Sequence, residues 1–325
     1  MAESIPTDKV WVSLITNTNY LPGLLTLAHT LRQARSRYPL IALYPASFPA
    51  SGLSALSARS IPALQVPFLS PRAGGPRYAS DPRFRDTWTK LVVFSLTQFS
   101  RLVHLDSDMI VRRNIDELLD DDEEEGEGEE EKRAGLLRLE DGDSAVFAAS
   151  HACVCNPLKR PHYPRDWTPQ NCAFTAQHRD PARAQVEGAN PSRVGLGLLN
   201  SGLLVVRPDA DRFDEIRRHM DEHADEYTFP DQDLLADLYR GRWKALPYVY
   251  NALKTMRSPD VHGAIWRDDQ VKIVHFILSP KPWDEVDEHG QPTKTGGVHD
   301  ELHKWWFEAN NQRLLMEKEL GLDRA

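Results

Sequence analysis

The chain has 325 residues, of which 41% are hydrophobic, enough for one large domain or two ordinary ones. Residues 120–131 contain ten acids and account for the net charge of −9; the remainder carries about +1, which excludes a broad basic surface for nucleic acid or membrane. The chain lacks an apolar run of ~18 residues and a recognisable secretory signal, and its three cysteines fit a reducing, cytoplasmic location.

The amino-terminal part alternates predicted strands with predicted helices. Apolar runs predict strands at 10–16, 40–44, 64–69 and 101–106, and helical spacing of apolar residues predicts helices at 22–37 and 87–99. This alternation indicates an α/β fold with a mixed, mostly parallel central sheet and helices on both faces. Ligands of such folds bind at the carboxyl ends of the strands, so we expect a binding site just after the strand at 101–106.

The remaining sequence is more irregular. It predicts strands at 145–149, 198–206 and 271–276, and helices at 211–227, 231–239 and 299–320. Residues 151–195 are rich in Pro, Asn, Arg and His and are expected to form loops over the sheet that help to shape a substrate pocket. Because no repeat or linker is evident, we expect a single domain over 1–325 with a disordered acidic loop at 119–133.

The stretch "RLVHLDSDMIV" places two carboxylates, Asp106 and Asp108, at the end of a buried strand. Oxygen ligands at this spacing could share a Mg²⁺ or Mn²⁺ ion, although a solvated turn of aspartates is the competing interpretation. His275 also ends a predicted strand, and a nitrogen ligand added to two carboxylates favours Mn²⁺. Lys281 follows it closely and could contact a phosphate at the same metal; otherwise it is a surface lysine between two prolines.

Several motifs in order resemble those of glycosyltransferase family 8, the family of glycogenin and galactinol synthase. They are "TNTNY", "TWTKL", "HLDSDMIV", "LLNSGLLVV", "FPDQDLL", "YVYNAL" and "VHFILSPKPW". The segment "RSRYPLIAL" and the tryptophan pair of "LHKWWFE" are most similar to galactinol-synthase-like proteins. The resemblance implies a GT-A type, Rossmann-like nucleotide-sugar transferase fold and a hexosyltransferase that uses a UDP-sugar and Mn²⁺ and retains the anomeric configuration.

The resemblance also implies roles for individual residues. The metal would be held by Asp106, Asp108 and His275. The donor would be contacted by Leu14, Thr16, Asn17, Tyr20, Lys90, Asp106, Ser107, Asp108, Asn200, Ser201 and Lys281. The candidates near the reacting carbon are Asp231, Gln232, Asp233 and Lys281. For most of these polar residues, a helix cap or a turn is the structural alternative.

The sequence departs from the family in two places. A glycine that often lies between the strand histidine and the lysine is absent from residues 276–280, and Pro280 has no N–H with which to bind a phosphate. The acceptor tyrosine of glycogenin-like proteins is also absent between Asn251 and His275. We therefore expect UDP-galactose and a small polyol such as myo-inositol as substrates, with a glycogenin-like glucosyltransferase as the alternative and a homodimer left open.

Three other interpretations remain. Cys153, Cys155 and Cys172 could bind zinc together with His151, but C-x-C spacing is unusual for structural zinc, so reduced structural thiols are favoured. The D-x-D stretch also resembles the nucleophile loop of haloacid-dehalogenase-type phosphatases, although Ile110 replaces the usual Thr or Val there. A catalytically inactive sugar-nucleotide-binding protein is the non-enzymatic alternative.

Overall fold

The structure is a computed structural model, and it describes residues 7–72, 84–120, 145–190, 196–287, 292–293 and 300–322. Most of the stretch 119–133, which the sequence predicts to be a disordered acidic loop, lies outside these residues. Within the described ranges, no helix is both long and apolar enough to cross a bilayer.

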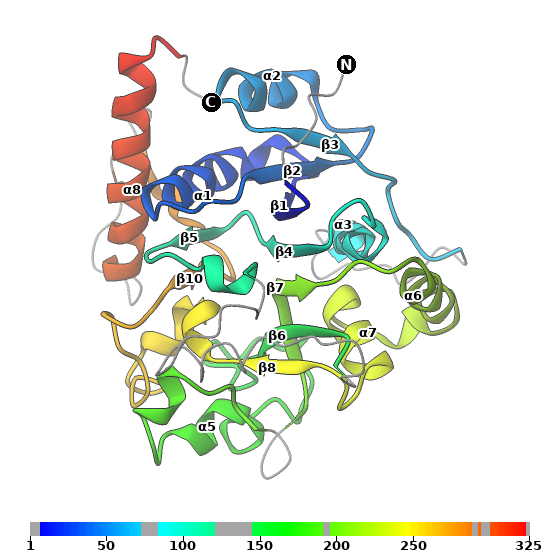
Figure 1. The fold of residues 1–325 in the computed structure, drawn as a ribbon. Helices are drawn as coiled ribbons and strands as arrows, with labels where there is room; N and C mark the ends of the chain where they lie inside the picture. Colours follow the sequence, from blue (N-terminus) through cyan, green and yellow to red (C-terminus); the bar gives the residue numbers. More distant parts are fainter. Residues whose placement is uncertain are drawn as a thin grey trace.

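A mixed, seven-stranded sheet runs through the centre of the molecule (Figure 1). Its strand order is β3-β2-β1-β4-β7-β6-β8. The first four strands in this order are parallel, whereas β7 is antiparallel to both β4 and β6. The bounds are β1 Lys9–Leu14, β2 Leu40–Tyr44, β3 Ala63–Gln65, β4 Arg101–Leu105, β6 Phe147–His151, β7 Leu199–Val206 and β8 Lys244–Leu246.

A second, three-stranded sheet begins where β4 ends. It consists of β5 Met109–Val111, β10 Ile273–His275 and β9 Ala252–Leu253, with β10 in the middle. β10 is antiparallel to β5 and places His275 opposite Met109. The turn that carries Asp106 and Asp108 therefore joins the two sheets, and β10 brings a histidine to the same point.

Helices cover both faces of the main sheet, as the sequence predicts (Figure 1). Alternate side chains of β1 enter two apolar clusters: Trp11 packs in the cluster that includes residues of α1 and α8, and Val10 and Val12 pack in the cluster of α6 and α7. The α-helices are α1 Leu21–Gln33, α2 Ala50–Ala58, α3 Phe84–Thr87, α5 Ala173–Gln177, α6 Ala210–His223, α7 Pro230–Leu238 and α8 Asp300–Glu319. The principal 3₁₀ helices are η1 Thr18–Tyr20, η2 Trp88–Ser95, η3 Asp116–Leu118, η7 Tyr248–Tyr250, η8 Lys254–Arg257 and η9 Pro282–Glu285.

The predicted elements are confirmed with a few differences. The predicted helix at 87–99 is a 3₁₀ helix over Trp88–Ser95 that follows the single turn of α3, and the predicted strand at 64–69 is reduced to Ala63–Gln65. The sequence did not predict α2, β5, β8 or β9. Strands of two or three residues are too short to show a periodic hydrophobic pattern, and α2 buries little more than Leu56.

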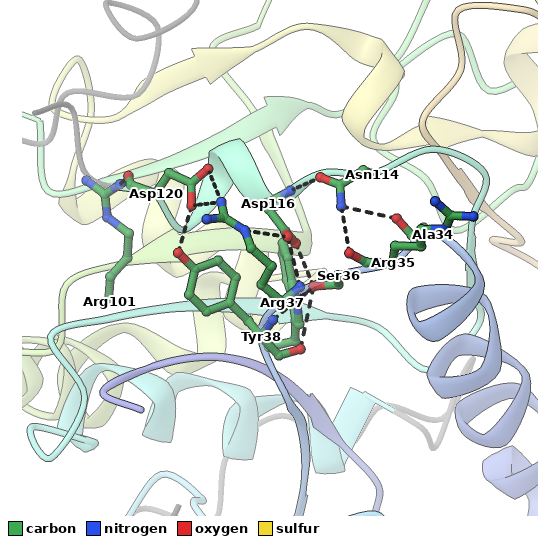
Figure 2. Close-up of polar contacts among 10 residues, drawn as sticks. Ala34, Arg35, Ser36, Arg37, Tyr38, Arg101, Asn114, Asp116 and Asp120 are labelled. Carbon is green, nitrogen blue, oxygen red and sulfur yellow. Dashed lines mark hydrogen bonds and ion pairs between the residues drawn. The ribbon is translucent and has the colours of Figure 1, made fainter. Parts of the chain in front are cut away.

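Asp116 fixes the turn that leads from α1 into β2 (Figure 2). Its buried carboxylate accepts hydrogen bonds from the Ser36 hydroxyl at 2.5 Å and from the Arg37 backbone N–H at 2.9 Å. Asp120 binds the Arg37 guanidinium at 2.6 Å and the Tyr38 hydroxyl at 2.7 Å. These contacts hold the chain after β5 against the start of β2.

We expect Asp116→Ala to lower the free energy of unfolding by about 2 kcal/mol, because it removes the buried carboxylate that accepts the hydrogen bonds of Ser36 and Arg37. Asp120→Ala is the comparison, and we expect it to cost less than about 1 kcal/mol because that ion pair is partly exposed. Urea unfolding followed by circular dichroism measures both. Equal losses in the two variants would contradict the anchoring role of Asp116.

Candidate active site

Asp106 and Asp108 lie at the junction of the two sheets, on the wall of a cleft of about 880 Å³. The Asp106 N–H donates to the Gly202 carbonyl of β7 at 2.8 Å, and the Phe276 N–H donates to the Asp108 carbonyl at 2.9 Å. These two backbone hydrogen bonds tie the turn to both sheets. The cleft volume lies within the ~300–1,000 Å³ range of small-molecule sites.

The structure brings the three predicted metal ligands together. His275 Nε2 lies 3.3 Å from Asp108 Oδ1 and 3.7 Å from Asp106 Oδ2, and one ligand atom from each residue falls within 4.8 Å of the others. His275 Nδ1 is 2.9 Å from Asn251 Oδ1. When the ring donates its Nδ1–H to this amide oxygen, the Nε2 lone pair faces the carboxylates, which is the orientation that a metal ligand requires.

Two lysines balance the charge of the aspartates. Lys281 Nζ is 2.5 Å from Asp108 Oδ2, and Lys90 Nζ is 2.9 Å from Asp106 Oδ1 and 3.1 Å from Asp231 Oδ2. Burial alone would raise the pKa of Asp108, but the charges of Lys281 and His275 outweigh it and hold this pKa below its usual range. Burial likewise opposes the charge of Lys90, yet its two carboxylate partners raise its pKa.

Behind His275, a chain of amide hydrogen bonds reaches the donor-sugar candidates. Asn251 Nδ2 donates to Asn200 Oδ1 at 2.8 Å, and Asn200 Nδ2 lies 3.4 Å from Gln232 Oε1. Asn200 Oδ1 also accepts the Gly202 N–H at 3.1 Å. Asn200, which the resemblance assigns to the donor sugar, therefore also holds Asn251, and Asn251 orients His275.

Gly202 leaves the space that the His275 ring occupies. A Cβ at this position would lie 2.4 Å from His275 Cε1 and 2.9 Å from Asn200 Oδ1. Any larger side chain would therefore push the imidazole or the amide away. The sequence analysis did not single out this glycine, because its role becomes visible when β7 and β10 are placed side by side.

The predicted uridine-binding residues also line the cleft, and Lys281 Nζ lies 5.8 Å from the centroid of the Tyr20 ring. The Thr16 hydroxyl donates to Asp86 Oδ2 at 2.6 Å, and the ring of Tyr20 meets the edge of Trp283 with 5.6 Å between centroids. Asn17 also caps η1, because its side chain accepts the Asn19 N–H at 3.1 Å. Other predicted donor contacts on the cleft wall are Leu14, Ser107, Asn200 and Ser201.

Asp231, Gln232 and Asp233 all lie at the start of α7, but their side chains have different surroundings. Asp231 and Gln232 line the cleft. The Asp233 carboxylate instead accepts the N–H groups of Thr228 at 3.0 Å and Phe229 at 2.7 Å, as a helix-capping residue does. Burial raises the pKa of Asp233 to about 6. This placement gives Asp233 a structural role at the beginning of the helix rather than a position at the reacting carbon.

The cleft also contains residues that the sequence analysis did not identify. Trp167 stacks on Phe229 with 4.9 Å between ring centroids, and Tyr163 meets the edge of Phe229 at 5.3 Å. Tyr163 and Trp167 belong to the segment 151–195, which we expected to shape a substrate pocket, and all three rings line the cleft. The roles of Asp86, Asn251 and Gly202 were not predicted, although Asn251 and Gly202 lie in family motifs, because each acts through a partner far away in the sequence.

The loop after β10 compensates for its missing glycine. Leu278 has a φ of +64°, the left-handed conformation that favours glycine. Lys254 donates to the Pro280 carbonyl at 2.7 Å, and Asp284 Oδ2 accepts the Lys281 N–H at 2.9 Å. Burial and the neighbouring charge of Lys281 lower the pKa of Lys254 to about 8. The loop thus delivers Lys281 to the carboxylates without a glycine.

Known proteins share this sequence and this fold. Residues 11–287 match the family model "Glycosyl transferase family 8". Galactinol synthase 6 of Arabidopsis thaliana is 24% identical over 303 residues, which cover 89% of this chain and 77% of that protein.

Solved glycosyltransferases confirm the GT-A type of α/β fold. The galactosyltransferase LgtC, solved with donor and acceptor sugar analogues, superposes with a TM-score of 0.56 at 16% identity and covers 93% of this chain and 96% of LgtC. GlyE of Streptococcus pneumoniae gives a TM-score of 0.55 at 14% identity, over 97% of this chain but 65% of GlyE. With the family match spanning most of its length, the chain belongs to glycosyl transferase family 8 and is a hexosyltransferase.

Proposed function

We propose that the enzyme transfers a hexose from a UDP-sugar, with UDP-galactose favoured, to a small polyol or sugar such as myo-inositol, with the help of Mn²⁺. The observation that carries this proposal is the cluster of Asp106, Asp108 and His275 on the cleft wall, with Lys281 beside it. Two carboxylates and one imidazole suit Mn²⁺. The bound ion would neutralise the donor diphosphate and assist the departure of UDP.

The lysines supply positive charge on two sides of this cluster. Lys281 is buried against Asp108, so its charge adjoins the position proposed for the diphosphate and would stabilise the charge that develops on the leaving group. Lys90 pairs with both Asp231 and Asp106, which supports a role for Asp231 beside the donor sugar. Thr16, Asn17 and Tyr20, which also line the cleft, would contact the uridine.

We favour front-face attack over a covalent glycosyl-enzyme. Asp231 is ion-paired with Lys90, which weakens it as a nucleophile, and the Asp233 carboxylate is hydrogen-bonded to the backbone at the start of α7. In front-face attack, the bond from the anomeric carbon to the UDP oxygen breaks while the acceptor oxygen bonds to the same carbon. The acceptor proton passes to the departing phosphate, so no protein nucleophile is required.

A small acceptor agrees better with the sequence than self-glycosylation. There is no tyrosine between Asn251 and His275 to act as a primer, and the galactinol synthases are among the relatives of this chain. The aromatic rings of Tyr163, Trp167 and Phe229 offer a compact apolar wall for a cyclic acceptor. Family membership leaves the phosphohydrolase interpretation without support, and the homodimer stays a prediction.

We expect Asp106→Asn and Asp108→Asn each to weaken Mn²⁺-dependent UDP binding by at least about 100-fold, because each removes an anionic ligand. His275→Ala should weaken it less, because it removes a neutral ligand. Isothermal titration with UDP, with and without Mn²⁺, measures the effect, and Asp214→Asn on the exposed surface of α6 is the control. Wild-type affinity in a folded Asp108→Asn protein would contradict the metal assignment.

Gly202→Ala tests the geometry of the same site without changing any ligand. The added methyl group would displace His275, so we expect about 10–100-fold weaker Mn²⁺-dependent UDP binding and a loss of about 1–3 kcal/mol in unfolding free energy. Gly197→Ala is the matched control, because a Cβ there meets nothing within 4 Å. Equal UDP affinities and equal unfolding free energies in the two alanine variants would contradict a role for the close packing of Gly202 against His275.

A substrate screen tests the donor and the acceptor together. UDP-glucose, UDP-galactose and UDP-N-acetylglucosamine are each incubated with and without myo-inositol, and mass spectrometry follows both the small molecules and the intact protein. We expect a hexosyl-inositol from UDP-galactose and an unchanged protein mass. A ladder of hexose additions on the protein would instead support the glycogenin-like alternative, and a single trapped hexose would support the covalent mechanism.

A further inference from the structure

Three cysteines and a histidine form a second cluster at the edge of the main sheet. Cys153 and Cys155 follow β6, Cys172 precedes α5, and His262 lies in the turns between η8 and β10. One ligand atom of each residue falls within 4.8 Å of all the others. The cluster adjoins α5, which lies beyond β8 at the opposite end of the molecule from α2 (Figure 1).

The distances within this cluster fit one tetrahedral metal ion. His262 Nε2 lies 3.3 Å from Cys155 Sγ and 3.3 Å from Cys172 Sγ. In a tetrahedral zinc site, bonds of ~2.3 Å to sulfur and ~2.0 Å to nitrogen place a sulfur and a nitrogen ligand roughly 3.5 Å apart and two sulfur ligands roughly 3.8 Å apart. A thiol cluster alone explains the arrangement less well, because one imidazole lone pair cannot accept hydrogen bonds from two thiols at once.

A second histidine orients the first. His178 Nε2 is 2.9 Å from His262 Nδ1. When His262 donates its Nδ1–H to His178, its Nε2 lone pair points at the sulfur atoms. A zinc-bound histidine usually makes such a hydrogen bond through its other ring nitrogen, and here an imidazole takes the place of the more common carboxylate or carbonyl acceptor. Cys172 is the N-cap of α5 and His178 is its C-cap. This short helix therefore carries a proposed ligand at one end and the supporting histidine at the other.

The cluster is closed to solvent on most sides. Cys172 and His262 are 0% exposed, Cys155 is 9% exposed, and Cys153 is partly buried. Four protein ligands in such surroundings are typical of a structural zinc site rather than a catalytic one, which keeps a position for water. The C-x-C spacing is compatible with this, because side chains two residues apart can lie on the same side of an extended chain, and both thiols converge with Cys172 and His262.

We propose that Cys153, Cys155, Cys172 and His262 bind one structural Zn²⁺, with His178 as a positioning residue. The thiols lose their protons to solvent on binding, and thiolate with imidazole ligands favours Zn²⁺ over Mg²⁺ or Mn²⁺. The ion would join the segment that carries Tyr163 and Trp167 to the turns before β10. It would therefore stabilise the aromatic wall of the cleft, and its existence does not depend on the proposed substrates.

Zinc content of the purified protein tests the proposal directly. We expect one Zn²⁺ per chain by elemental analysis, with loss of the metal in Cys172→Ser and in His262→Ala. His29→Ala, which removes a buried histidine of α1, and Asp108→Asn should both retain it. His178→Ala should bind zinc about 10–100-fold more weakly in competition with a chelator and still reach full occupancy at saturation.

Cobalt substitution of the wild-type protein avoids dependence on variants that fold poorly. Co²⁺ held by three thiolates and one imidazole should give intense visible bands of a tetrahedral site and a sulfur-to-metal charge-transfer band. Removal of the zinc should also lower the thermal unfolding temperature. Folded wild-type protein that takes up no Zn²⁺ and gives no tetrahedral Co²⁺ spectrum would overturn the proposal, as would a disulfide found by mass analysis under non-reducing conditions.

Discussion

The structure depends on the neutralisation of two carboxylates at the end of a buried strand. Asp106 and Asp108 would repel each other and lose hydration, which costs several kcal/mol for each ion left unpaired. Lys90 and Lys281 approach them from opposite sides, and His275 lies between them. These partners come from η2, β10 and the loop after β10. The need to neutralise Asp106 and Asp108 therefore determines which elements meet at the end of β4.

The fold was predictable from the sequence because its long elements have a regular hydrophobic period. The predicted strand at 40–44 and the alternation of strands and helices are confirmed, whereas short β5 and β9 contain too few residues to show a period. The convergence of Asp106, Asp108 and His275 was predictable from motif order and from strand ends. The roles of Gly202 and Asn251 were not, because Gly202 packs against His275 and Asn251 hydrogen-bonds to it, and both contacts join segments that are far apart in the sequence.

The spacing of the cysteines along the chain was not enough to identify the full ligand set of their cluster. Zinc motifs with C-x₂₋₄-C spacing are recognisable because two ligands come from one turn. Here Cys153 and Cys155 lie in the segment that follows β6, Cys172 precedes α5, and His262 lies in the turns between η8 and β10. The sequence analysis paired these cysteines with nearby His151, whereas the structure places His262 beside them and His151 against the Leu198 carbonyl.

The two sides of the cleft differ in how they are held. On the proposed donor side, strands, backbone hydrogen bonds and ion pairs fix Asp106, Asp108 and His275, so this side is rigid through the ordinary interactions of the sheet. The wall formed by Tyr163 and Trp167 lies in a stretch whose regular elements are one five-residue helix and short 3₁₀ turns. Such a stretch gains little from secondary structure, and cross-links commonly supply the missing stability in these cases. A metal ion that ties β6, α5 and the turns at His262 together would be such a cross-link, and it would allow an irregular segment to present a fixed aromatic surface to an acceptor.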